Sequence, residues 1–240
     1  MPATESTGRR VLVSGGTSGI GWAIAQHFAQ AGDVVVATGA TAGEVARAEA
    51  VPGVSFEALD VRDEAGIAAF MARQATLDVL VNCAGVIRRG AEHDPAVFAE
   101  VIDINLNGSM RLCAAARPLL AASRGCIVNT ASMLTFFGGG LVPAYAASKG
   151  GIGQLTKSLA IAYADEGIRV NAVAPGWIAT PLTQALQDDP VRSGPILART
   201  PMKRWGTPDD VAGPVLFLAS AQARFVTGTI LPVDGGYLIT

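Results

Sequence analysis

The sequence contains few charged and few aromatic residues, and this scarcity excludes several classes of protein. Asp, Glu, Lys and Arg together make up 16% of the 240 residues, aromatic residues make up 6%, and the formal net charge is -2. So small a net charge gives no general attraction to nucleic acid or to anionic membranes. No run of basic residues would form a tail or a groove. We therefore expect neither nucleic acid nor a membrane as a partner.

Long apolar runs are also absent, although half of the residues are apolar. No stretch approaches the roughly 20 residues that span a bilayer, and the opening MPATESTGRR lacks the apolar core of a signal peptide. Cysteine is scarce: Cys83, Cys113 and Cys126 lie in unrelated apolar settings, without ligand-like spacing to either histidine. These features predict a cytoplasmic protein with reduced thiols and no metal site.

Short β-branched segments alternate with alanine-rich helical segments along the chain. The pattern predicts strands over residues 9–16, 33–39, 53–59, 77–85, 125–132, 168–176 and 228–236, and helices over 19–32, 42–50, about 95–120, 145–167 and 208–220. Continuous apolar strands separated by helices indicate parallel, right-handed crossovers. We predict one α/β domain over residues 1–240, a single doubly wound parallel sheet (Rossmann fold) with helices on both faces. A Pro- and Gly-rich segment at about 177–206 predicts a small lid after the sixth strand.

A glycine-rich turn, SGGTSGIG, directly follows the first predicted strand. Gly15, Gly19 and Gly21 allow positive φ and a close approach of the backbone to a ligand. The start of the next helix offers free N–H groups to an anionic pyrophosphate. The spacing is G-x-x-x-G-x-G rather than the usual G-x-G-x-x-G. Its place after the first strand of an α/β pattern predicts dinucleotide binding.

From this turn onward the sequence resembles the short-chain dehydrogenase/reductase family over essentially its whole length. The turn at 14–21, LDV at 59–61, NCAG at 82–85 (with Cys83 where the family has Asn) and PGWIAT at 175–180 all follow the family order. The resemblance implies that Asp60 is a polar contact to adenine and that Ile178 and Thr180 touch the nicotinamide carboxamide. The implied cofactor residues are Gly15, Thr17, Ser18, Gly19, Ile20, Gly21, Thr38, Gly39, Ala40, Asp60, Val61, Asn82, Ala84, Gly85, Tyr145, Lys149, Pro175, Gly176, Ile178 and Thr180.

The end of the second predicted strand leaves the choice between NAD and NADP open. An acidic residue there would bind the ribose 2′-OH of NAD, and a nearby Arg would accommodate the 2′-phosphate of NADP. The sequence has Gly39 where the acid would fall and Ala40 where the Arg often falls. No carboxylate at these positions would repel a 2′-phosphate, and Thr38 or Thr41 could hydrogen-bond to either cofactor.

Tyr145 and Lys149 are four residues apart, which places them on one face of a helix. A lysine beside a tyrosine lowers the pKa of the phenol and makes it a useful proton donor and acceptor near neutral pH. The family resemblance implies that Tyr145 is the general acid/base and that Lys149 lowers its pKa and holds the nicotinamide ribose. It also implies that Ser132 hydrogen-bonds the substrate oxygen and that Asn105 holds a water connecting Lys149 to solvent. Hydride would pass between the alcohol carbon and the nicotinamide while the hydroxyl proton moves to the tyrosinate.

The segments around this predicted site resemble the sugar-acid branch of the family, which implies oxidation of a secondary hydroxyl on a deoxy-ketogluconate. Arg88, in the Arg-Arg pair at 88–89, could bind the carboxylate or could face solvent. Leu141 occupies a position where this branch carries a basic residue, and this weakens the prediction that the substrate is a sugar acid. Three side chains would make the pocket partly apolar, or would fill the core: Met133, Phe137 and Trp177.

Three alternatives stay open at this stage. The first is a 3-oxoacyl thioester reductase, whose branch shares small residues after the second strand. The second is a dehydrogenase of neutral sugars or polyols. The third is a dinucleotide-sensing protein on the same fold, although such sensors usually lack the Tyr and Lys. The family is commonly tetrameric, so the resemblance also implies a homotetramer.

Overall fold

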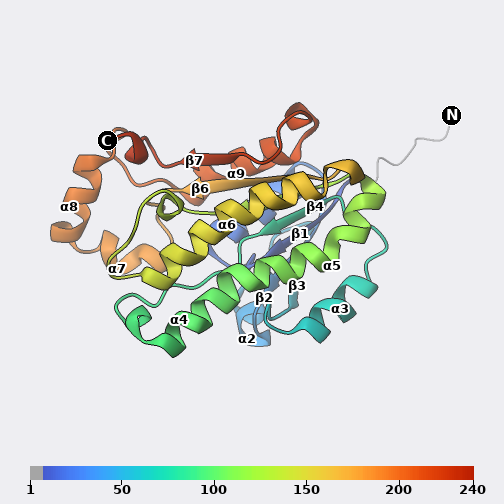
Figure 1. The fold of residues 1–240 in the computed structure, drawn as a ribbon, viewed down its shortest axis with the longest axis horizontal. Helices are drawn as coiled ribbons and strands as arrows, with labels where there is room; N and C mark the ends of the chain where they lie inside the picture. The colour runs from blue at the N-terminus through green and yellow to red at the C-terminus, as the bar shows by residue number, and fades with distance from the viewer. Residues whose placement is uncertain (1–7) are drawn as a thin grey trace.

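The centre of the molecule is one parallel β-sheet, shown in Figure 1; the computed structural model describes residues 8–240. The strands are β1 (Arg10–Ser14), β2 (Val34–Gly39), β3 (Val54–Ala58), β4 (Val79–Asn82), β5 (Cys126–Thr130), β6 (Arg169–Pro175) and β7 (Ile230–Val233). Their order across the sheet is β3-β2-β1-β4-β5-β6-β7, and every neighbouring pair is parallel. Because strand addition changes direction between β1 and β4, the sheet is doubly wound, as predicted.

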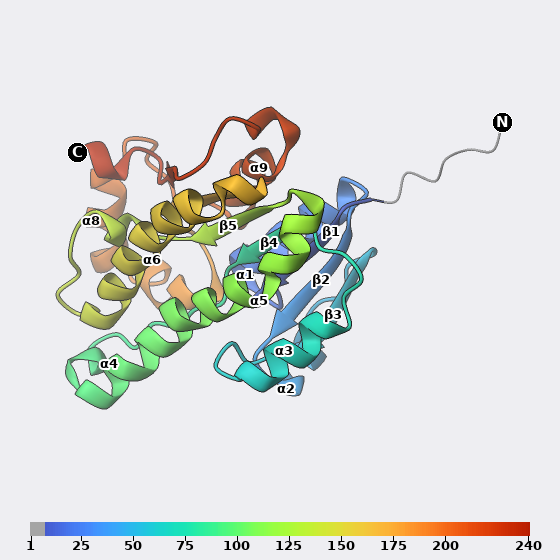
Figure 2. The same ribbon diagram turned by 45° about the vertical axis from the view of Figure 1, so that its right-hand side comes forward.

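Helices cover both faces of this sheet (Figures 1 and 2). They are α1 (Gly19–Gln30), α2 (Ala42–Arg47), α3 (Glu64–Ala72), α4 (Pro95–Ile102), α5 (Gly108–Ser123), α6 (Pro143–Ala162), α7 (Gln184–Gln187), α8 (Pro190–Arg199) and α9 (Pro208–Ala219). Helices α1 and α9 pack in one apolar layer, and α3, α5 and α6 pack in the other. No helix of residues 8–240 has the length and apolarity needed to cross a membrane.

Alternate side chains of each strand enter the two layers. In β1, Val11 and Val13 pack with α1 and α9, whereas Leu12 packs with α3 and α5. Successive residues of a strand point to opposite faces, and here both faces are covered. All three side chains are at most 2% exposed. This two-sided burial explains why the strands read as continuous apolar runs.

Two departures from the expected elements concern helices. The prediction lacks α3, which Asp63 caps by accepting a hydrogen bond from Gly66 N at 2.9 Å. Nine residues are too few for hydrophobic periodicity to separate a helix from a loop. The helix expected at about 95–120 is divided by a π-helical turn at Asp103–Asn107 between α4 and α5. Such turns concentrate at functional positions, and this one contains Asn105.

The segment at 177–206 connects β6 to α9 and contains α7 and α8. Its two ends are joined by a parallel bridge between Ile178 and Gly206, and Ala179 N donates to Gly206 O at 2.8 Å. The segment therefore leaves the sheet after β6 and returns to nearly the same point before α9. That it moves as a lid stays a prediction.

Candidate active site

Most of the residues predicted for the site lie at the carboxyl ends of adjacent parallel strands. Ser14 ends β1, Asn82 ends β4, Thr130 ends β5 and Pro175 ends β6, and these strands are neighbours in the sheet. Ligands of open α/β sheets bind in the crevice outside the carboxyl ends, where the strand order reverses. The topology therefore brings together segments that lie far apart in the sequence, from Ser14 to Pro175.

The glycine turn packs tightly against the residues that follow β4. Gly15 has φ +66°, and a Cβ built on it would lie 2.6 Å from the Cα of Ala84. A Cβ on Gly21 would overlap the carbonyl oxygen of Gly15. A Cβ on Gly19 would lie 3.6 Å from Thr180 Cγ2, so the turn also approaches the loop after β6. Two of the predicted cofactor segments are thus side by side, and the turn requires glycine.

The polar groups around the turn suit a dinucleotide. Ser18, the N-cap of the twelve-residue α1, makes no side-chain capping hydrogen bond, so the first N–H groups of the helix are available to an anion. Thr38 at the end of β2 is 1% exposed, and its Oγ1 has no hydrogen-bond partner within residues 8–240. A buried hydroxyl without a partner is costly, and a ligand hydroxyl or phosphate would satisfy it.

The predicted adenine contact, Asp60, is held by a neighbouring arginine. Arg62 Nη2 lies 2.6 Å from Asp60 Oδ2, and the Arg62 backbone N donates to Oδ1 at 2.9 Å. The hydrogen bonds from Arg62 lower the pKa of the Asp60 carboxyl below its usual value. Asp60 is therefore an ionised acceptor at the end of β3.

Tyr145 and Lys149 lie on the first two turns of α6, as the spacing predicts. Lys149 is 4% exposed, its Nζ donates to Thr130 O at 2.6 Å, and Nζ lies 5.5 Å from the centroid of the Tyr145 ring. Ser132 N-caps the short turn after β5 and is 7% exposed. Three of the four predicted catalytic residues therefore meet at the end of β5.

The expectation that Lys149 lowers the pKa of the Tyr145 phenol is wrong for the protein alone. Burial raises the pKa of Tyr145 to about 12, and this outweighs the lowering by a hydrogen bond with Ser132. Burial also lowers the pKa of Lys149 to about 8. Desolvation disfavours both charged forms, because neither the phenolate nor the ammonium has a strong opposite charge beside it. Lys149 alone does not lower the pKa of the phenol.

Asn105, the fourth predicted catalytic residue, is fully buried in the π-helical turn. Its Nδ2 donates to Val86 O at 2.9 Å and to Ser148 Oγ at 3.1 Å, and its Oδ1 accepts from Val86 N at 2.8 Å. The side chain thereby joins the segment after β4 to α6. Its predicted role in holding a water near Lys149 stays a prediction.

The structure also identifies Glu92, which the sequence analysis missed. Glu92 is 1% exposed; its Oε1 accepts from Arg88 N and its Oε2 from Tyr145 N, both at 2.8 Å. The N-cap of α6, Val142, has no side-chain acceptor, so Glu92 caps the helix that carries Tyr145. No local pattern marks this residue, because its partner Tyr145 is 53 positions away.

The residues predicted for substrate binding divide into two groups. Arg88 Nη2 pairs with Glu100 Oε1 at 3.0 Å on the exposed side of α4, so its charge is already partnered. Phe137 and Trp177 instead pack around Tyr237, with ring centroids at 6.2 Å and 6.3 Å. The Arg199 guanidinium at the end of α8 lies 4.1 Å from the Tyr237 ring centroid. Met133 is buried beside Ser132.

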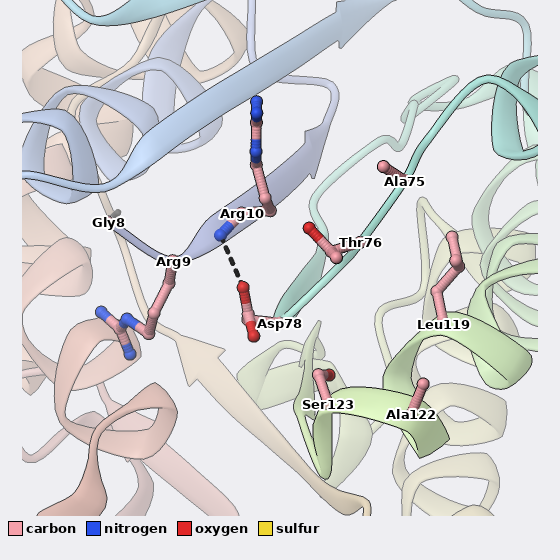
Figure 3. A pocket seen from close by; sticks show the side chains of 9 residues that line it. All are labelled: Gly8, Arg9, Arg10, Ala75, Thr76, Asp78, Leu119, Ala122 and Ser123. Atoms are coloured by element: carbon pink, nitrogen blue, oxygen red, sulfur yellow. Dashed lines mark hydrogen bonds between the residues drawn. The ribbon is translucent and has the colours of Figure 1, made fainter. Parts of the chain in front are cut away.

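A separate pocket lies at the opposite end of the sheet, around the start of β1 (Figure 3). There Arg10 N donates to Asp78 Oδ2 at 2.7 Å, and Ser123 lines the opposite wall. None of the predicted catalytic or cofactor residues lines this pocket. It surrounds the amino ends of β1 and β4, whereas ligands of such sheets bind beyond the carboxyl ends.

Comparisons with known proteins cover nearly the whole chain. A family model described as enoyl-(acyl carrier protein) reductase matches residues 15–238. A 2-dehydro-3-deoxy-D-gluconate 5-dehydrogenase of Pseudoalteromonas atlantica is 43% identical, with 96% of each chain covered. A cis-4-hydroxycyclohexanecarboxylate dehydrogenase of Sinomonas cyclohexanicum is also 43% identical, covering 95% of this chain and 96% of the relative.

A solved structure from Agrobacterium tumefaciens, provisionally assigned as a 2-deoxy-D-gluconate 3-dehydrogenase and containing NADP, is 41% identical with a TM-score of 0.87, and 98% of each chain is covered. The family model, the relatives and the fold agree over nearly the whole length. The chain therefore belongs to the short-chain dehydrogenase/reductase family, as a nicotinamide-dependent oxidoreductase of alcohol groups.

Proposed function

We propose that the protein transfers hydride between a nicotinamide cofactor and a secondary hydroxyl of a sugar acid such as 2-dehydro-3-deoxy-D-gluconate. The observation that carries this proposal is the meeting of Tyr145, Lys149 and Ser132 at the end of β5, which β4 alone separates from β1, the strand that leads into the glycine turn. A proton donor and acceptor, a buried cation and a hydroxyl are what alcohol oxidation beside a dinucleotide site requires.

Each residue has a distinct part in the proposed reaction. Tyr145 Oη accepts the substrate hydroxyl proton during oxidation and returns it during reduction. With substrate and cofactor bound, the Lys149 ammonium would favour the phenolate form of Tyr145, and the Ser132 hydroxyl would donate to the substrate oxygen as negative charge develops on it. The nicotinamide, when bound, accepts or supplies the hydride. Asn105 and Glu92 keep α6 and the segment after β4 in register with these groups.

The cofactor would be held by the residues around the glycine turn and the neighbouring strand ends. The N–H groups at the start of α1 would bind the pyrophosphate, and Thr38 and Asp60 would contact the adenosine half. The nicotinamide half would lie between the turn and the loop of Ile178 and Thr180, and Lys149 would hold its ribose. Support comes from the packing of the turn against this loop, where a Cβ built on Gly19 would lie 3.6 Å from Thr180 Cγ2.

The substrate class is inferred from the relatives rather than from the predicted arginine. The two curated relatives act, by their names, on compounds that carry both a hydroxyl and a carboxylate. Arg88 would have to leave Glu100 to reach a carboxylate, so it adds little to the sugar-acid reading. The cluster of Phe137, Trp177 and Tyr237 would provide apolar walls for the carbon skeleton.

A spectrophotometric assay of reduced cofactor tests this substrate class. The protein is given NAD or NADP with the deoxy-ketogluconate or with neutral polyols, and NADH or NADPH with a 3-oxoacyl thioester. We expect kcat/KM for the sugar acid to exceed that for the polyols by at least about tenfold, because a substrate that lacks a recognised polar group loses at least that much transition-state binding. Thioester reduction without sugar-acid turnover would move the protein to the acyl branch. Cofactor binding without turnover of any compound would overturn the substrate assignment alone.

We further infer a homotetramer in the cytoplasm. Large apolar side chains are exposed on helix surfaces, including Phe98 of α4 and Met110 of α5, each 37% exposed. Large apolar side chains exposed on helix surfaces suit contact with a second copy. The free thiols Cys83, Cys113 and Cys126 suit a reducing compartment. Light scattering after size-exclusion chromatography checks the assembly, and a monomer at micromolar concentration would contradict it.

A further inference from the structure

The carboxylate that the sequence lacks at the end of β2 is provided by the next helix. Glu44 lies in α2, five residues after Gly39, and Figures 1 and 2 show α2 beyond the end of β2. Its Oε2 accepts a hydrogen bond from Ala40 N at 2.8 Å. Thr41, the N-cap of α2, accepts from Glu44 N at 3.1 Å and sets the first turn of the helix. The side chain of Glu44 is therefore folded back over the strand end.

The position of this carboxylate can be located relative to Gly39. A Cβ built on Gly39 would lie 3.1 Å from Glu44 Oε2 and 2.8 Å from Thr17 Cγ2. An aspartate at position 39 would hold its own carboxylate just beyond such a Cβ. Glu44 thus places its carboxylate where the missing acid would have been, between β2 and the glycine turn. In a sheet of this kind that point faces the adenosine ribose of a dinucleotide.

The surrounding charges leave Glu44 without a close cation. Within residues 8–240 Glu44 forms no ion pair, and Arg62 is taken by Asp60 at the neighbouring strand end. Arg47 follows on the same helix, and its Nη1 approaches Gly43 rather than the carboxylate: it would lie 3.5 Å from a Cβ built there. An ionised carboxylate without a cation repels a phosphate and accepts hydrogen bonds from hydroxyls.

We propose that Glu44 selects NAD over NADP by occupying the place of the 2′-phosphate. Its carboxylate would accept a hydrogen bond from the ribose 2′-OH of NAD. It would also oppose NADP in two ways, since it places like charge against the phosphate and engages the Ala40 N–H that could otherwise bind it. The inference rests on the proposed cofactor site.

The test compares binding of NADH and NADPH by fluorescence titration, so that it needs no substrate. Glu44→Gln removes the charge and keeps an oxygen that can accept from Ala40 N, which preserves the start of α2. Glu49→Gln is the matched control, because Glu49 is an exposed residue just beyond α2. We expect wild type and Glu49→Gln to bind NADH at least about tenfold more tightly than NADPH. In Glu44→Gln this preference should shrink by about tenfold, mainly through tighter binding of NADPH.

The outcomes separate this inference from the proposed function. Equal affinity for the two cofactors in wild type, or an unchanged preference in Glu44→Gln, would overturn the role of Glu44 and leave the cofactor site intact. Failure of the wild type to bind either cofactor would overturn the proposed cofactor site itself, and the role of Glu44 with it. A far-ultraviolet circular dichroism spectrum and a thermal melt of each variant establish that the compared proteins are folded.

Discussion

Tyr145→Phe is expected to lower kcat by about 10²- to 10⁴-fold, the usual contribution of a positioned general acid or base. The substitution removes one hydroxyl and leaves the ring that packs 5.5 Å from Lys149 Nζ. Affinity for the reduced cofactor should therefore stay close to the wild-type value. Steady-state kinetics in both directions, together with a fluorescence titration of reduced cofactor, measure the two effects separately. A dinucleotide-sensing protein would show no such separation, because it has no turnover to lose.

Tyr163→Phe is the matched control for this change. Tyr163 is the C-cap of α6, at the opposite end of the helix from Tyr145. It is 4% exposed, and its ring packs against the Arg117 guanidinium. Its kcat should remain within about twofold of wild type, as is usual for a substitution away from a site. The assignment of Tyr145 fails if Tyr145→Phe keeps more than about a tenth of wild-type kcat.

Lys149→Met is expected to lower kcat/KM by about 10²-fold at neutral pH, with an additional loss of cofactor affinity. The variant keeps an unbranched apolar chain but removes the buried ammonium that donates to Thr130 O. Without the cation, burial and the negative charge of Glu92 both oppose the phenolate of Tyr145. The expected fall in kcat/KM therefore has two causes. The phenolate of Tyr145 becomes less favourable, and the contact proposed between Lys149 and the nicotinamide ribose is removed.

The pH dependence of the same variant gives a sharper check. Burial lowers the pKa of Lys149 to about 8, so the ammonium is present below that pH and is lost above it. The ratio of kcat/KM between wild type and Lys149→Met should be largest below about pH 8 and should fall as the pH rises further. A ratio that is constant to high pH would show that charge is not what Lys149 contributes. Lys157→Met, at an exposed position of α6, serves as the control.

The candidate site was predictable wherever it depends on residues close in sequence. The four-residue spacing of Tyr145 and Lys149 determines that they share a helix face, and the structure places them there. The glycine spacing was predictable for the same reason, because a strand-to-helix turn is a local structure. The pKa of Tyr145 was not, since burial by distant segments outweighs its neighbours in sequence.

Contacts between distant segments decided the remaining features. Glu92 caps the helix of Tyr145, although the two residues are 53 positions apart. Arg88 forms an ion pair with Glu100 of α4, so its charge is not free for a substrate. Glu44 is nearer in sequence to Gly39, but only the fold of α2 back over β2 shows that its carboxylate fills the missing position.

The sequence by itself determined the alternating strands and helices, the doubly wound sheet and the residue types at the carboxyl ends, because periodicity and turn chemistry act over short range. Only the tertiary structure decided which charges are buried, which are paired and which lie at the carboxyl ends of the strands. The physical reason is that desolvation and ion pairing depend on every group packed around a side chain, and most of those groups come from elsewhere in the chain.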